Sequence, residues 1–380
     1  MILAGIYIHI PFCSQFCSYC DFYSVNQTEK VDDFTEALVK EIVIRSNDLK
    51  NKGLSVNTVY FGGGTPSLIS IPSLKAILSA LYENYPLSPA GVKERTIEVN
   101  PDDITTQYLD GLRECGFNRL SMGIQSFSDQ HLKWMNRRHN TQTALNSFEL
   151  ARKAGFSNIS IDLIFGFEML TTKEWKENLL KAISLSPEHI SAYQMSIEKG
   201  TTLHRNYIKG AYLQPPDESS ARQYSMLQEE LAKGGYIQYE ISSFCKPGLY
   251  SQHNSSYWDF TPYFGFGPSA HSFDGTFRHR NFSSLAKYIK TMKAGESFGP
   301  SHKQSLKERF NEYIMLSLRR TEGIDKEVLE KSFKKFIKHQ FQSELGRLTE
   351  AGFLLEESGK IRIPPEHLFV SDGIIRDLFV

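Results

Sequence analysis

Short apolar runs rich in β-branched residues recur along the first half of the chain, and each is followed by a segment with helical spacing. The runs predict strands at residues 5–10, 58–61, 96–99, 119–123, 158–164 and 189–194. Between them, apolar residues recur at spacings of three and four, which predicts helices at residues 33–45, 71–85, 104–115, 141–155 and 173–185. Alternating strands and helices indicate parallel β/α units. Six such units are too few for a closed eight-fold barrel, so we expect an α/β fold with a partial (β/α)6 TIM-like barrel over residues 1–214.

The pattern changes after this barrel segment. Residues 215–300 are rich in aromatic residues and glycine and contain strand-like pieces such as 236–244, which predicts an α+β subdomain. Residues 301–380 begin with a polar linker and then show helical patterns at 306–320, 326–334 and 341–352, with a hairpin pattern at 353–363. Three helices and a hairpin predict a winged-helix-like C-terminal module.

The charges of the chain balance, with 43 basic and 43 acidic residues, so the net charge does not favour nucleic acid as a partner. A basic stretch at residues 331–338 is short, and a redox-sensing regulator that reads nucleic acid is therefore the least favoured hypothesis. No stretch approaches the roughly 18 apolar residues of a membrane span, and the N-terminus has no basic signal segment. The expected localisation is cytoplasmic.

Three of the five cysteines, Cys13, Cys17 and Cys20, lie within eight residues directly after the first predicted strand. This crowding differs from a disulfide framework and indicates metal ligation. Soft thiolates on one short loop suit an iron–sulfur cluster, and three ligands leave one iron of a [4Fe–4S] cluster open to a small molecule. A structural zinc site stays open as an alternative, with His9 as the nearby fourth ligand.

Polar or glycine residues follow several of the predicted strands. The glycine turn at residues 62–66 follows the second strand, and Glu98, Gln125 and Asp162 lie at or near the ends of later ones. Active sites of β/α barrels lie at the carboxyl ends of the strands, so these side chains are candidates for one shared site.

The Cys-x3-Cys-x2-Cys loop after the first strand, with the aromatic Tyr19, resembles that of the radical S-adenosylmethionine superfamily. The resemblance implies that the cluster iron not bound by protein is chelated by the amino and carboxylate groups of S-adenosylmethionine. It also implies the residues that contact this cofactor, which are Tyr7, Gly63, Gly64, Thr65, Glu98, Gln125, Arg137 and Asp162.

Within that superfamily, residues 7–13, 98–101 and 123–127 resemble the branch that contains the oxygen-independent coproporphyrinogen III oxidase HemN and the HemW-type haem chaperones. A fourth cysteine of the HemN loop is replaced here by Phe22, and the first predicted strand starts almost at the N-terminus, without room for an N-terminal extension. The segment His253-Asn-Ser-Ser-Tyr257-Trp258 is similar to the HNxxYW signature of the HemW type. The resemblance implies haem as a further ligand, with His253 and Tyr257 as candidate iron ligands.

The function implied by this resemblance is haem binding and delivery to apo-haemoproteins of the respiratory chain, with the cluster and S-adenosylmethionine in a supporting role. Transient contact with a membrane and a homodimer are left open, and no nucleic acid is expected. The alternative is a radical S-adenosylmethionine oxidoreductase that acts on a porphyrinogen, so whether the protein is an enzyme stays open.

Overall fold

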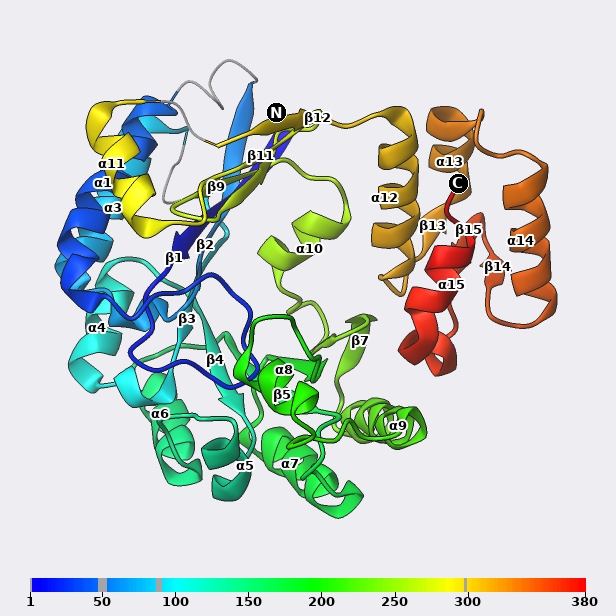
Figure 1. The fold of residues 1–380 in the computed structure, drawn as a ribbon, viewed down its shortest axis with the longest axis horizontal. Helices are drawn as coiled ribbons and strands as arrows, with labels where there is room; N and C mark the ends of the chain where they lie inside the picture. Colours follow the sequence, from blue (N-terminus) through cyan, green and yellow to red (C-terminus); the bar gives the residue numbers. More distant parts are fainter. Residues whose placement is uncertain (1, 47–52, 87–90, 297–298) are drawn as a thin grey trace.

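Six parallel strands form the barrel wall in the computed structural model, which describes residues 2–46, 53–86, 91–296 and 299–380 (Figure 1). They are neighbours in chain order: β1 (Ile2–Ile10), β2 (Leu54–Gly63), β3 (Glu94–Val99), β4 (Arg119–Gln125), β5 (Ile159–Phe165) and β6 (His189–Gln194). Every pairing between successive members of this set is parallel. The predicted α/β fold with a partial barrel is confirmed.

Alternation along the strands separates an apolar outer face from a polar inner face. Ile6, Ile8 and Ile10 of β1 are fully buried in the core, whereas Tyr7 and His9 point to the other side of the strand. The same alternation on β3 puts Glu98 on the inner face. The inside of the barrel is therefore polar and suited to ligands.

Helices cover the outside of the barrel (Figure 1). They are α1 (Val31–Ile44), α3 (Ile71–Asn84), α4 (Thr106–Glu114), α5 (Asp129–Trp134), α6 (Thr141–Lys153) and α7 (Thr172–Leu185), with short 3-10 turns η1 (Thr28–Lys30), η2 (Pro66–Leu68) and η3 (Pro101–Asp103). Helix α8 (Thr202–Ile208) lies against the cysteine loop instead. The helix predicted at 104–115 begins later because the Thr105 side chain caps it, accepting a hydrogen bond from the backbone N–H of Tyr108. Helices α5 and α8 were not predicted.

The segment predicted as an α+β subdomain extends the barrel sheet at both edges. Its elements are α9 (Asp217–Lys233), β7 (Ile237–Glu240), β8 (Ser243–Cys245), α10 (Gln252–Trp258), β9 (Tyr263–Phe266), β10 (His271–Phe273), β11 (Phe277–Arg280) and α11 (Leu285–Ala294). Strands β8 and β7 continue the sheet beyond β6, while β9, β10, β11 and β12 (Ser301–Lys303) continue it beyond β1. The boundaries at residues 214 and 300 stay a prediction.

The chain crosses from one edge of the sheet to the other through α10. Strand β8 pairs with β6, and β9 pairs with β1, so the connection between them spans the open side of the barrel (Figure 1). The HNxxYW segment forms this helix, which places it at the barrel and away from any separate domain.

The C-terminal segment forms a module of helices and a small antiparallel sheet, as predicted. Helices α12 (Leu306–Leu318), α13 (Lys326–Phe333), α14 (His339–Glu350) and α15 (Ser371–Asp377) accompany the turn η4 (Pro365–Val370) and strands β13 (Ile324–Asp325), β14 (Leu355–Glu357) and β15 (Lys360–Arg362). The buried Phe310 contacts the rings of Phe333, Phe336 and Phe341 at the centre of the module. No helix within the described parts of the chain is long and apolar enough to cross a lipid bilayer.

Candidate functional site

The three cysteines of the first loop are unbridged and lie at the carboxyl end of β1. Neighbouring loops hold this segment through its backbone. The N–H of Cys13 donates to Val25 O at 3.0 Å, the N–H of Ser18 donates to Met135 O at 3.0 Å, and the carbonyl of Ser18 accepts from the N–H of Leu203 at 2.7 Å. The cysteine loop is therefore held by the segment that follows it and by two segments from distant parts of the sequence.

Arg137 connects the cysteine loop to the ends of two strands. Its Nη1 donates to Cys17 Sγ at 3.2 Å, and its Nη2 donates to Gly123 O at 2.7 Å and to Asn100 Oδ1 at 3.1 Å. The negative charges that Tyr19 and Cys17 carry when ionised raise the pKa of the guanidinium despite burial. A permanent positive charge therefore lies against the sulfur of Cys17.

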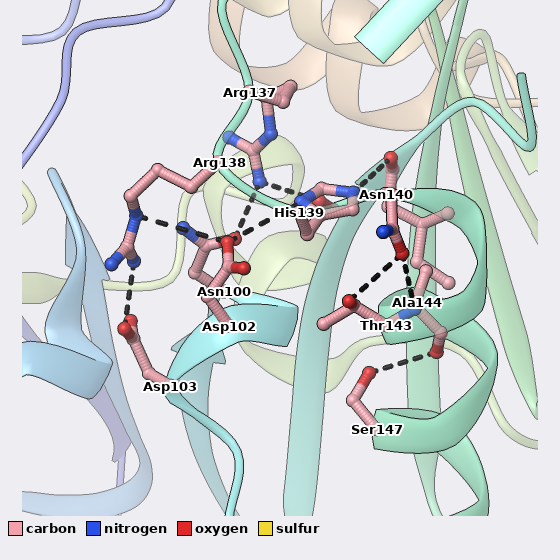
Figure 2. Close-up of polar contacts among 12 residues, drawn as sticks. Asn100, Asp102, Asp103, Arg137, Arg138, His139, Asn140, Thr143, Ala144 and Ser147 are labelled. Carbon is pink, nitrogen blue, oxygen red and sulfur yellow. Dashed lines mark hydrogen bonds and ion pairs between the residues drawn. The ribbon is translucent and has the colours of Figure 1, made fainter. Parts of the chain in front are cut away.

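The two residues after Arg137 fix the position of its loop (Figure 2). Arg138 Nη2 donates to Asp103 Oδ1 at 2.8 Å, and His139 Nε2 lies 3.1 Å from Ile124 O. Asn140 then caps α6, accepting from the backbone N–H of Thr143 at 2.8 Å. The residues that follow Arg137 thus hold its loop in place, an arrangement that the sequence did not reveal.

The glycine turn after β2 lies directly against the cysteine loop. Gly63 has φ +114°, a conformation that L side chains rarely adopt. A Cβ at Gly64 would come within 2.6 Å of Phe12 O and 3.0 Å of Cys13 Sγ. Thr65 Oγ1 donates to Cys13 Sγ at 3.5 Å. These positions require glycine because backbone and sulfur approach each other closely here.

Two carboxyl groups face the inside of the barrel at successive depths. Glu98 accepts from Tyr60 OH at 2.8 Å and from the N–H of Gly63 at 3.1 Å. Desolvation raises its pKa to about 7, although the hydrogen bond from Tyr60 opposes the shift. Desolvation also raises the pKa of Asp162 to about 6, opposed by a hydrogen bond with Ser191. Both groups change charge near neutral pH.

Gln125 ends β4 in a strained backbone conformation, with φ +68°. Its Nε2 atom lies so close to Gly123 that a Cβ there would be 2.9 Å away, and Arg137 Nη2 would be 3.3 Å from the same point. The structure therefore brings Gln125 and Arg137 together over Gly123. A strained non-glycine residue of this kind is often part of a ligand site.

Tyr7 and His9 lie deeper in the barrel below the cysteine loop. Tyr7 OH lies 3.1 Å from His9 Nδ1, and His9 Nε2 lies 2.9 Å from Tyr23 O. Both ring nitrogens of His9 are engaged, so this residue would have to give up one of these hydrogen bonds to supply the fourth ligand of the zinc alternative. Within the described residues, no three His, Cys, Asp or Glu side chains are grouped to hold a single metal ion.

His253 of α10 occupies the amino-terminal end of the barrel, opposite the cysteine loop. Its Nδ1 lies 2.8 Å from Thr58 Oγ1 and its Nε2 lies 2.8 Å from Tyr257 OH. The side chain is fully buried, and desolvation lowers its pKa to about 3. The two candidate haem ligands are therefore hydrogen-bonded to each other, and the imidazole is neutral.

Two charged residues that were not predicted as site residues lie at the amino-terminal end of the barrel. The carboxylate of Glu94 accepts from the backbone N–H groups of Gln252 and His253 at 2.8 and 3.1 Å and so holds the start of α10. Arg119 is buried, and its Nε and Nη1 atoms have no hydrogen-bond partner among the described residues. Only Arg119 lies within a predicted strand, 119–123, where a charge beside apolar residues was the available signal; Glu94 precedes the predicted strand 96–99.

Two parts of the chain match models of known protein families. Residues 7–182 match the model of the radical SAM superfamily, and residues 304–370 match that of the HemN C-terminal domain. The solved structure of coproporphyrinogen III oxidase HemN from Escherichia coli shares the fold, with a TM-score of 0.85 over 100% of this chain and 90% of that one, at 23% identity.

Sequence relatives extend over nearly the whole chain. A Bacillus subtilis protein named heme chaperone HemW is 36% identical over 357 residues, which are 93% of each chain. The Lactococcus lactis protein of the same name is 32% identical over 94% of this chain and 92% of its own. With this identity over this length, the chain belongs to the HemW family of the radical S-adenosylmethionine superfamily.

Proposed function

We propose that this protein binds haem and delivers it to apo-haemoproteins, including those of the respiratory chain, and that its barrel binds a [4Fe–4S] cluster and S-adenosylmethionine. The observation that carries the haem part is the relationship to the Bacillus subtilis heme chaperone HemW over 93% of both chains. The position of the HNxxYW segment in the barrel supports it, because His253 and Tyr257 form one buried pair.

The cysteine loop fits an iron–sulfur cluster. Three unbridged thiols lie on one loop, and Gly64 leaves the space beside Cys13 that a larger residue would fill. When bound, such a cluster supplies electron transfer and an open iron position. Cys13, Cys17 and Cys20 would bind it, and the Arg137 guanidinium would donate to the sulfur of Cys17.

The neighbouring polar groups fit S-adenosylmethionine. Glu98 and Asp162 offer oxygen acceptors for amino and ribose hydroxyl groups, and Gln125 offers an amide beside them. Gly63, Gly64 and Thr65 let the backbone approach the ligand. Tyr7 lies one layer below and stacks on Tyr60, the hydroxyl partner of Glu98.

Iron ligation by His253 requires a change in its hydrogen bonds. The neutral imidazole is competent as a ligand, but Nε2 is paired with Tyr257 OH. Replacing Tyr257 with phenylalanine removes this partner and keeps the ring. If His253 ligates iron, Tyr257→Phe retains haem binding; if Tyr257 is the ligand, this variant loses it.

The test is an anaerobic haemin titration of the cluster-reconstituted protein, with the Soret band, iron and sulfide all measured. Wild type should bind stoichiometrically, and His253→Ala should lose or shift the band with its cluster intact. His189→Ala is the matched control, because His189 is also buried between a strand hydroxyl and a tyrosine, Ser160 and Tyr239. Equal loss in both variants, or no binding by wild type, would contradict the proposal.

The second candidate function is a radical S-adenosylmethionine oxidoreductase acting on a porphyrinogen. The whole-chain fold similarity to HemN favours it. Anaerobic incubation with coproporphyrinogen III, S-adenosylmethionine and a reductant distinguishes the two functions. Formation of protoporphyrinogen would establish the oxidase, and the chaperone hypothesis expects none.

A further inference from the structure

A cleft of about 420 Å³ lies between the end of α10 and the C-terminal module. The barrel side contributes Trp258, Phe260 and Phe273, and the module side contributes Tyr313 and Phe333. Most of its apolar lining is therefore aromatic. In Figure 1, α10 and α12 face each other across this region.

Phe260 is held in an unfavourable backbone conformation at the entrance to β9. Its φ is +61°, which is uncommon for a bulky residue and costs on the order of 1–3 kcal/mol. Its ring is stacked on Tyr313 with centroids 6.1 Å apart and lies 6.2 Å from Phe273. The strain keeps a flat aromatic surface in the cleft, between the barrel and the module.

Three cations, Arg309, Arg320 and Lys360, line the same cleft. Arg320 is paired with Glu322, and Lys360 is paired with Asp325 at 2.7 Å. Arg309 forms no ion pair with any described residue and is exposed. The remaining acid, Asp259, accepts the backbone N–H of Thr261 at 3.0 Å. Arg309 is therefore the cation available to an incoming anion.

We propose that this cleft binds a planar aromatic ligand with carboxylate groups, and that it is the place where the haem macrocycle lies. The aromatic rings contact the faces of the macrocycle, and Arg309 pairs with a propionate. The inference rests on the proposed haem binding and adds a location to it. Trp258, which lines the cleft, and His253 belong to the same helix, so α10 carries residues of both the cleft and the candidate iron site.

The test separates recognition of the macrocycle from iron ligation by using metal-free protoporphyrin IX and its dimethyl ester, both in the same mild detergent. Porphyrin fluorescence is followed as cluster-reconstituted protein is added. Arg309→Glu should weaken binding of the dicarboxylate about tenfold, the size of one lost charge-assisted hydrogen bond, and leave the ester within about twofold. Lys307→Glu is the control, since it makes the same charge change on α12 outside the cleft lining.

A second variant tests the aromatic wall and keeps the backbone conformation at Phe260. Phe260→Gly removes the ring and relieves the positive φ, so the native backbone conformation is kept. It should weaken binding of both the dicarboxylate and the ester. If Arg309→Glu and Phe260→Gly bind the porphyrin as well as wild type does, and wild type binds haemin, the proposed site in the cleft is overturned. The proposal that the protein binds haem then stays intact. Binding of haemin without binding of the metal-free porphyrin would also overturn it. If wild type binds none of these ligands, both proposals fail.

Discussion

Glu98 and Asp162 show how burial changes the behaviour of single residues in this barrel. Both were expected from their positions at or near the ends of predicted strands, but their partners were not. Tyr60 and Ser191 come from neighbouring strands, and only the register of the sheet brings them to these carboxyl groups. A sequence without strand register shows which residues are polar, but does not show which of them meet.

These two carboxyl groups should make the cluster-free protein less stable as the pH rises. The pKa of Glu98 is raised from 4.5 to about 7 and that of Asp162 from 3.8 to about 6, so the folded state binds more protons than the unfolded state between these values. The free energy of unfolding then falls from about pH 4 to pH 7, by on the order of 3 kcal/mol per group. Urea unfolding of wild type, Glu98→Gln and Asp162→Asn across this pH range measures how the free energy of unfolding changes. Parallel curves in all three proteins would rule out this effect.

Gln125 combines backbone strain with a proposed ligand contact, and substitutions separate the two. Gln125→Gly relieves the positive φ and should keep or raise the free energy of unfolding, whereas Gln125→Val should lower it by about 1–3 kcal/mol. Both should weaken binding of S-adenosylmethionine, measured by calorimetry on the reconstituted protein. Full binding by the glycine variant would show that the side chain makes no contact.

Helix α10 shows the limit of sequence patterns for whole elements. The core strands and five of the barrel helices were predicted because their periodicity is strong and long. Helix α10 has seven residues, too few for a clear period, and its start is held by Glu94 from another strand. The 17-residue helix α9 was also not predicted, because most of its residues are polar. The aromatic and glycine content of the surrounding segment indicated strands and loops instead.

Removal of the carboxylate that holds α10 should loosen this helix. Glu94→Ala leaves two backbone N–H groups without an acceptor and should cost about 1–3 kcal/mol each if they stay buried. Hydrogen exchange of the α10 amides should accelerate in this variant. Ser251→Ala, which removes only the hydroxyl acceptor of the Asn254 N–H, should have a smaller effect. Similar exchange in wild type and Glu94→Ala would mean that the packing of His253 alone holds the helix.

At the scale of the whole molecule, the C-terminal module was predicted as a unit, but its attachment was not. Arg319 makes part of this attachment, beside contacts such as the ion pair between Arg278 and Glu312. The Arg319 guanidinium lies 4.6 Å from the centroid of the Trp258 ring, and its Nε lies 3.3 Å from Glu240 Oε2. The backbone adds an antiparallel bridge between Glu240 and Arg320. These contacts of Arg319 and Arg320 join residues about 60 to 80 positions apart, a separation at which sequence patterns carry no information.

Loss of the Arg319 side chain should therefore weaken the attachment of the module before it unfolds the barrel. In Arg319→Met, limited proteolysis should cut the connection near residues 299–305 faster than in wild type, while the barrel fragment stays protected. Arg309→Met, a cation on the same helix that forms no ion pair with a described residue, is the control. Equal cleavage of the two variants would show that Arg319 does not hold the module.

The stacked rings inside the barrel have a thermodynamic consequence. His253 lies 5.0 Å from Tyr60 between ring centroids, and the Tyr60 hydroxyl donates to Glu98, so one chain of contacts joins the two ends of the barrel. A ligand that draws His253 out of this stack changes the surroundings of Glu98. Linkage is reciprocal, so a ligand at Glu98 alters affinity at His253 by the same factor. A ligand bound at one end of the barrel thereby changes the binding affinity at the other end.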